Sequence, residues 1–132
     1  MSAVVVQPDG WPRPAGYANA IAAHGRLVAV AGQVGWDPRT ERFTARDMAG
    51  QVAQALRNIA EVLAAAHAKP EHVVRLTWYV TDLAAYVAAR PGIGEAYRAV
   101  FGSHYPAMSV VEVKGLMERD AVVEIEATAV VP

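Results

Sequence analysis

Hydrophobic and polar positions along this 132-residue chain follow two different periods, and each period predicts a class of element. Apolar side chains recur at steps of three and four residues from Met48 to Leu63, which places them on one helical face. This pattern predicts an amphipathic helix that ends near residue 66. A second helical stretch covers residues 84–101, and Pro91 divides it into a short first piece and a longer second one.

Alternation with a period of two predicts three strands, at residues 73–81, 108–113 and 121–131. Two shorter apolar stretches, 17–23 and 26–31, predict a hairpin with a tight turn between them. The expected order is β-β-α-β-α-β-β, which is an α+β fold in a single domain over residues 1–132. Two helices cannot cover both faces of such a mixed sheet, so we expect them on one face and self-association on the other.

The last strand carries the most informative alternation. Its odd positions are apolar, whereas Glu124, Glu126 and Thr128 occupy the face that the helices leave uncovered. A rise of ~3.4 Å per residue places the two carboxylates about 7 Å apart. Two interpretations stay open: ordinary surface charges that are solvated or paired with arginines such as Arg75, or a carboxylate tuned for acid/base chemistry where an oligomer interface buries it.

Composition narrows the function classes. The chain is 54% hydrophobic and 19% charged, which suits one compact domain. It has no cysteine, which excludes zinc ribbons, iron–sulfur clusters and cysteine nucleophiles. Twelve Lys+Arg against thirteen Asp+Glu give a net charge of −1, so we do not expect nucleic acid as a partner.

Neither a metal, a cofactor nor a membrane is expected. The four histidines lack the spacing of a metal-binding motif. Apolar runs stay well below the ~18 residues that span a bilayer, and the first six residues lack the charged and apolar regions of a secretory leader. We therefore expect a cytoplasmic protein.

Short motifs spread over nearly the whole chain are specific in combination: Gly16-Tyr17-Ala18, Val30-Ala31-Gly32-Gln33, Gln54-Ala55-Leu56-Arg57-Asn58-Ile59, Tyr79-Val80-Thr81-Asp82, Pro106-Ala107 and Val123-Glu124-Ile125-Glu126-Ala127. Together they resemble the reactive-intermediate deaminase family, also called Rid or YjgF-like and often labelled endoribonuclease L-PSP. The resemblance implies a chorismate-mutase-like fold without a cofactor, in a homotrimer whose sheets form a central barrel and whose three clefts lie between subunits.

The resemblance also implies roles for individual residues. Deaminating members hydrolyse enamines and imines that pyridoxal-phosphate enzymes release. Glu124 matches the glutamate that holds the attacking water, Tyr17 matches a tyrosine that helps to position the substrate, and Gly32 matches a glycine whose backbone lines the cleft. Trp36, in the glycine-containing loop that follows, is expected to line the pocket as well.

Three positions depart from the family pattern. Met108 stands where deaminating members have an arginine that clamps the substrate carboxylate, and a thioether cannot make such charge-assisted bonds. Gly94 replaces an asparagine before the helix tyrosine, and Val110 replaces a small residue or cysteine. We therefore expect these three residues to line a more apolar pocket that takes a different substrate.

Three hypotheses follow. The first is a divergent hydrolase that deaminates an enamine or imine metabolite, such as an aminomuconate-like intermediate of aromatic catabolism, with Glu124 as the catalytic residue. The second is a trimeric protein that binds or senses a small molecule without turnover. The third is the ribonuclease activity in the family label, which the missing basic groove disfavours. Release of ammonia separates the first hypothesis from the second.

Overall fold

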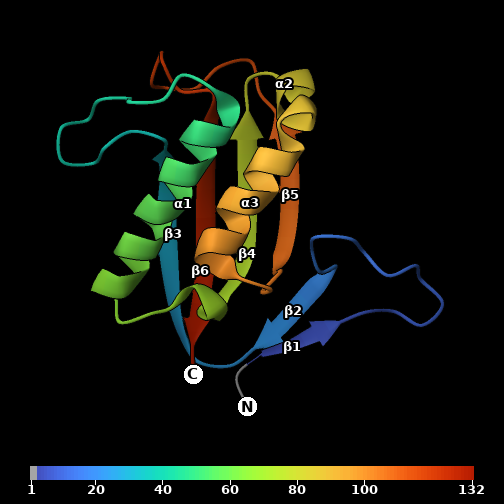
Figure 1. Ribbon diagram of the computed structural model, residues 1–132. Coiled ribbons are helices and arrows are strands. Elements are labelled where there is room, and N and C mark those ends of the chain that lie inside the picture. Colours follow the sequence, from blue (N-terminus) through green and yellow to red (C-terminus); the bar gives the residue numbers. More distant parts are fainter. Residues whose placement is uncertain (1–2) are drawn as a thin grey trace.

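Four strands form the main sheet, in the order β3-β6-β4-β5 (Figure 1). Their bounds are Arg26–Val34 for β3, Val123–Val131 for β6, Val73–Val80 for β4 and Ala107–Glu112 for β5. β6 runs antiparallel to β3 and β4, whereas β4 and β5 are parallel, so the sheet is mixed as expected. This computed structural model describes residues 3–132; Met1 and Ser2, part of the stretch tested for a leader, lie outside the described residues.

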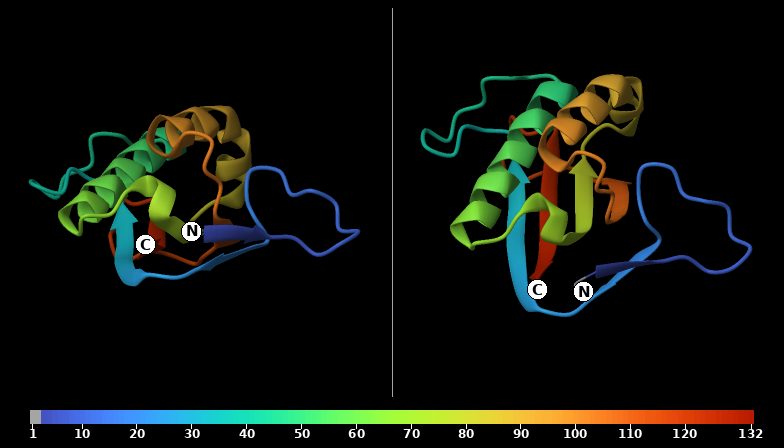
Figure 2. Two further views of the ribbon diagram at one scale, coloured as in Figure 1. Left: turned by 90° about the horizontal axis from the view of Figure 1, so that it is seen from below. Right: turned by 60° about the horizontal axis from the view of Figure 1, so that its bottom comes forward.

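The helices pack on one face of this sheet, as Figures 1 and 2 show. They are α1 (Met48–Ala65), α2 (Leu83–Ala88) and α3 (Arg90–Phe101), with a short 3-10 turn at Pro70–His72. The predicted apolar stripe of α1 is buried along its whole length. Asp47 begins this helix by accepting a hydrogen bond from the Gly50 amide at 3.1 Å. Pro91 lies in the first turn of α3, where its missing N–H breaks no helical bond.

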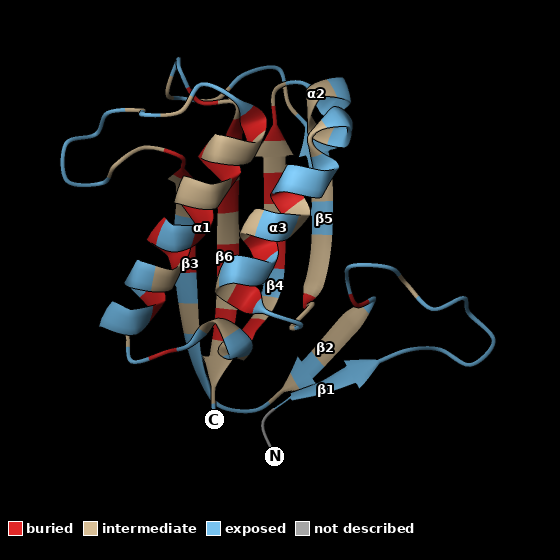
Figure 3. Ribbon diagram, viewed as in Figure 1, coloured by how far each residue is buried: buried red, intermediate tan, exposed pale blue. Residues whose placement is uncertain are grey.

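Alternation in β6 is confirmed from Val123 to Ala129. The odd positions of this stretch are buried, and its even positions are only partly covered (Figure 3). Val131, at the end of the strand, is partly exposed. Of the odd positions, Val123, Ile125 and Ala129 have no exposed surface at all. The even positions therefore present Glu124 and Glu126 on the other side of the sheet, which we call the open face.

The predicted hairpin is wrong. β2 (Ala20–Ala23) pairs with β1 (Ala3–Val6) in a separate two-stranded sheet, and β3 pairs with β6. Gly25, at a φ of +147°, bends the chain between them, and a side chain there would collide with the backbone of Val131. β6 offers β3 a partner of nine residues whereas β2 has four, so the long-range pairing forms more ladder hydrogen bonds. Residues 7–19 form a loop that extends away from the main sheet (Figure 2).

The buried side-chain amide of Gln51 on α1 fixes the loop that leads into β6. Gln51 has no exposed surface; its Nε2 donates to the carbonyls of Ala45 and Asp120, and its Oε1 accepts from the Val122 amide at 2.8 Å. A Cβ on Gly35 would lie 2.6 Å from the Gln51 Cα, so the end of β3 approaches α1 as closely as a glycine allows. The buried amide thus joins the start of α1 to the start of β6.

The Gln51→Leu substitution is expected to lower the free energy of unfolding by about 2–4 kcal/mol, because it leaves three partly buried backbone groups without their partner. Gln54→Leu is the matched control on the same helix. Within residues 3–132, Gln54 bonds to the side chains of Asn58 and Arg57 and to no backbone group, so a loss of about 1 kcal/mol is expected. Urea unfolding followed by circular dichroism measures both, and equal losses would contradict the assignment.

Candidate functional site

The open face carries the two predicted carboxylates and a tyrosine. Glu124 lies opposite Tyr79 on β4, and Glu126 lies opposite Thr77. The Tyr79 hydroxyl donates a hydrogen bond of 2.8 Å to Glu126 Oε1. This bond, together with desolvation and the negative charges of both glutamates, raises the pKa of Tyr79 above its usual value. The phenol therefore stays protonated at neutral pH and acts as a donor.

Pairing with arginine, one of the open interpretations of these carboxylates, does not occur within one chain. Among residues 3–132, the ion pairs are Arg39 with Glu61 and Arg46 with Asp120. Arg75 lies opposite Thr128 and is exposed. Glu124 on the open face therefore has no cationic partner among the described residues.

A β-bulge in β3 brings Gly32 against Glu124. The register between β3 and β6 shifts between Val30 and Gln33, so that two residues of β3 face one residue of β6. A Cβ on Gly32 would lie 2.8 Å from both Cγ and Cδ of Glu124 and even closer to one carboxylate oxygen. Only glycine leaves room for the carboxylate at this position. The structure thus joins two of the predicted site residues.

Gly94 and Met108 meet on the opposite side of the sheet. Met108 is the β5 partner of buried Leu76, so its side chain faces the helices rather than the open face. Together with Gly94 of α3 it lines a cavity of about 280 Å³, which we call the α3 cavity. Its other lining side chains include four aromatic rings and two cations, from Trp78, Tyr86, Tyr97, Tyr105, Arg90 and Arg98.

Tyr17 lies next to this cavity. It is 42% exposed and lines a larger hollow of about 610 Å³ under the loop of residues 7–19, together with Trp11 and Arg13. Gly16 and Tyr105 line both this hollow and the α3 cavity, so the two are neighbours.

The remaining two predicted residues have mainly packing contacts. The Trp36 ring packs on Phe43 at a centroid distance of 5.9 Å, and Asn58 Nδ2 donates to the Trp36 carbonyl at 2.9 Å. Val110 is the β5 neighbour of Trp78 and packs against the core.

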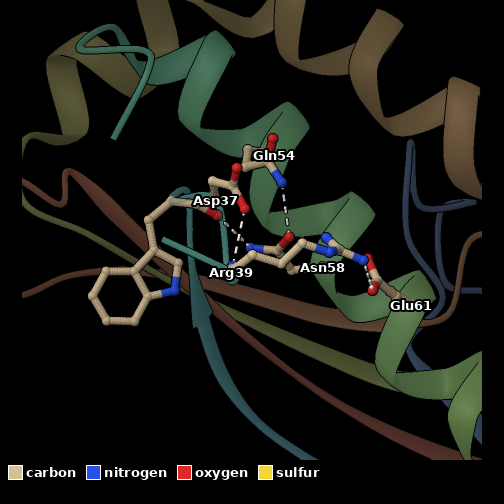
Figure 4. Close-up of polar contacts among 6 residues, drawn as sticks. Asp37, Arg39, Gln54, Asn58 and Glu61 are labelled. Atoms are coloured by element: carbon tan, nitrogen blue, oxygen red, sulfur yellow. Dashed lines mark hydrogen bonds and ion pairs between the residues drawn. The ribbon is translucent and has the colours of Figure 1, made fainter. Parts of the chain in front are cut away.

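The loop that follows Trp36 is tied to α1 by polar contacts (Figure 4). The Asp37 carboxylate accepts from the Arg39 amide at 2.9 Å, and the Arg39 guanidinium pairs with Glu61 at 2.6 Å. Both partners of this ion pair are exposed, so it adds little to stability. The loop therefore has a defined path beside α1.

Trp78, Arg90 and Arg98 also line the α3 cavity, and the sequence analysis named none of them. Trp78 is only 2% exposed. Its Nε1–H, however, is the buried side-chain donor that lacks a partner among residues 3–132. Arg90 and Arg98 were not singled out, although their spacing of four residues on either side of Gly94 is readable from the sequence.

In residues 3–132, no three His, Asp or Glu side chains gather closely enough to hold a metal ion. None of the helices in that part of the chain has both the length and the apolarity needed to cross a membrane.

The chain is similar in sequence and in structure to several known proteins. The model of the family described as "Endoribonuclease L-PSP" matches residues 12–131. A RutC family protein of Pyrococcus horikoshii is 35% identical over 126 residues, 95% of each chain. The 2-iminobutanoate/2-iminopropanoate deaminase of Salmonella typhimurium is 36% identical over 109 residues, 80% of each chain. The crystal structure of the Rid family protein YyfB from Yersinia pestis has a TM-score of 0.87 and 32% identity, covering 99% of this chain and 100% of that one.

Substitution of Glu126 by glutamine is expected to lower the pKa of Tyr79 toward 10, because the amide keeps an acceptor oxygen but removes the negative charge. The raised pKa means that the folded state holds the phenol proton more tightly, so this contribution to stability is present below pH ~10 and is lost at higher pH. Tyrosinate absorbance, with Tyr79→Phe subtracted, measures the titration. Glu95→Gln, an exposed control, should leave it unchanged; an unchanged titration in Glu126→Gln would refute the coupling.

Proposed function

The chain belongs to the Rid, or YjgF-like, family described as endoribonuclease L-PSP, and on this basis we propose that it hydrolyses the enamine or imine of a small metabolite and releases ammonia. The observation that carries the proposal is the Glu124 carboxylate, held against the bulge at Gly32 on the open face. A relative named as an imine deaminase supports the reaction class. β-Bulges commonly re-aim side chains beside active sites.

Glu124 supplies the acid/base chemistry in the proposed reaction. Its carboxylate accepts a proton from water while the water oxygen bonds to the carbon of the protonated imine, which gives a neutral carbinolamine. The protonated carboxyl then returns this proton to the nitrogen, the C–N bond breaks, and the hydroxyl proton passes to the departing ammonia. The products are a carbonyl compound and ammonium, and Glu124 is again a carboxylate. The Gly32 backbone lines the site beside it, because a side chain there would displace the carboxylate.

We further propose that the complete site lies between two copies of the chain, in a homotrimer. Glu124 and Gly32 are on the open face, whereas Met108 and Gly94 are on the helix side of the same sheet, with Tyr17 beside them. One copy cannot bring the two groups together, because its own sheet separates them. A site that uses both groups therefore combines the open face of one subunit with the α3 cavity edge of its neighbour.

Because residue 108 is a methionine, we propose a substrate other than a small 2-imino acid. A thioether offers no charge to a substrate carboxylate, so the substrate differs from that of arginine-bearing deaminases. An aminomuconate-like intermediate is one such compound. Binding of a small molecule without turnover is the alternative, and a trimer that binds metabolites but releases no ammonia would support it. We do not propose the ribonuclease activity, because a net charge of −1 provides no attraction for RNA.

Ammonia release identifies the reaction. Candidate imines and enamines are generated in situ, and their hydrolysis is compared with the uncatalysed rate. Glu124→Gln is expected to lower turnover by roughly 10²-fold or more without changing assembly, since it keeps the shape of the side chain but removes the base. Glu71→Gln, which changes an exposed carboxylate on the 3-10 turn, is the matched control and should retain activity. Full activity of Glu124→Gln would exclude its catalytic role.

Light scattering coupled to gel filtration tests the assembly. The expected mass is three times the 14.1 kDa of one chain. Ala29→Arg places a charge on the open face opposite Thr128 and is expected to reduce the mass to that of one chain. Ala64→Arg, on the exposed side of α1, makes the same change away from the sheet and should leave the trimer intact. A wild-type monomer at micromolar concentration would overturn the proposal of a shared site.

A further inference from the structure

The end of β3 beside Glu124 receives limited support from the sheet itself. β3 is an edge strand of the main sheet, so it pairs with β6 on one side only. The bulge interrupts this pairing between Val30 and Gln33. The ladder then resumes, and Val34 becomes the partner of Glu124. Because a bulge disrupts the ladder locally and bends the strand, the segment that faces the carboxylate needs a tie from another element.

Asn58 of α1 provides this tie. Its Nδ2 donates to the Val34 carbonyl at 3.1 Å and to the Trp36 carbonyl at 2.9 Å. The Asn58 side chain is buried, so water does not compete for these bonds. Between the two carbonyls, Gly35 approaches α1 so closely that a Cβ would lie 2.5 Å from the Gln51 carbonyl oxygen. The helix thus fixes the strand end at three consecutive residues.

A directed chain of hydrogen bonds orients the Asn58 amide. The guanidinium of Arg57 has only donors, and its Nη2 donates to Gln54 Oε1 at 2.8 Å. The Gln54 Nε2 in turn donates to Asn58 Oδ1 at 2.8 Å (Figure 4). Because its oxygen is occupied by Gln54, Asn58 presents its Nδ2 hydrogens to the strand. The cation on α1 therefore determines which end of the amide faces β3.

The Glu124 side chain rests directly on the strand that Asn58 holds. A Cβ at Gly32 would collide with the Cγ, the Cδ and one oxygen of Glu124, so the glycine backbone forms a wall against the carboxylate. A shift of this backbone toward β6 would push the carboxylate away, and a shift in the opposite direction would leave it free to turn. Gly32 precedes Val34 by two residues, so the position of the carboxylate depends on the tie at the strand end.

We propose that Asn58 is a positioning residue for Glu124: its two donated hydrogen bonds hold the bulged end of β3, and through Gly32 they fix the carboxylate where it can activate water. Asn58 acts through the β3 backbone and touches no substrate. The inference rests on the proposed function, in which Glu124 is the base. A misplacement of about 1 Å in a reacting group can cost about 10²-fold in rate, so a residue remote from the chemistry can control turnover.

Steady-state kinetics of imine hydrolysis test the role of Asn58. Asn58→Leu removes both donated bonds and nearly keeps the size of the side chain. It is expected to lower kcat about 10- to 100-fold and to change KM less than about threefold, because the base moves while the groups that bind the substrate stay in place. Leu63→Ala, which truncates a buried side chain more than one turn farther along α1, is the destabilised control and should keep kcat. Wild-type kcat in Asn58→Leu would overturn the inference.

Gln54 offers a milder variant that leaves Asn58 itself intact. Gln54→Glu replaces the donor to Asn58 Oδ1 by an acceptor, which draws the Asn58 Nδ2 away from β3. A fall of kcat by about three- to tenfold is expected, with KM nearly unchanged. Ala64→Glu adds the same charge to the exposed side of α1 and should keep wild-type kinetics. Thermal unfolding of each variant confirms that folded protein is assayed. Equal kcat in Gln54→Glu and Ala64→Glu would overturn the orienting role of the chain.

Crystal structures of the variants separate this inference from the proposed function. In Asn58→Leu, or in Gln54→Glu if the first variant does not fold, the Glu124 carboxylate is expected to leave its place against Gly32, whereas Leu63→Ala should retain it. An undisplaced carboxylate would overturn the inference whether or not the wild-type protein hydrolyses imines. A displaced carboxylate, together with a wild-type protein that releases no ammonia, would uphold the positioning by Asn58 and refute the hydrolase.

Discussion

Burial of one face of the β3-β6-β4-β5 sheet under α1 and α3 is the constraint on which the positions of all other groups depend. Each fully buried valine, leucine or isoleucine contributes about 1.5–3 kcal/mol, and β6 alternates such residues with polar ones. A register slip of one residue would bury Glu124 and Glu126 and expose Ile125, so the register is strongly determined. The two sheet faces therefore differ in chemistry: one is a packed core, and the other carries carboxylates and a protonated phenol.

Two local features shape the sheet around the Glu124 carboxylate. The β3 bulge removes Gly32 from the regular ladder and leaves space that the Glu124 side chain fills. Beyond the bulge, Asn58 donates to the carbonyls of Val34 and Trp36, which ties the end of the strand to α1. Because these amide contacts are buried, they keep the bulged strand in place beside the carboxylate.

Gly94 and Met108 line one cavity, although they come from separate elements. The guanidinium of Arg98 occupies the space above the glycine. A side chain at position 94 would displace this guanidinium, so the absence of a Cβ there leaves room for the cation at the cavity wall.

The sequence by itself determined the elements whose signals are local. The steps of three and four in α1 and the alternation of β6 depend only on which side chains must leave water, and both were predicted correctly; the family motifs likewise pointed to the fold. Tertiary structure decided the pairing of β2, which is governed by partners far along the chain rather than by the turn at Gly25. It also decided that Arg98, Trp78 and Met108 share one cavity, while Glu124 lies across the sheet from them. Such contacts join residues from separate elements, and no periodicity within one element encodes the distance between two of them.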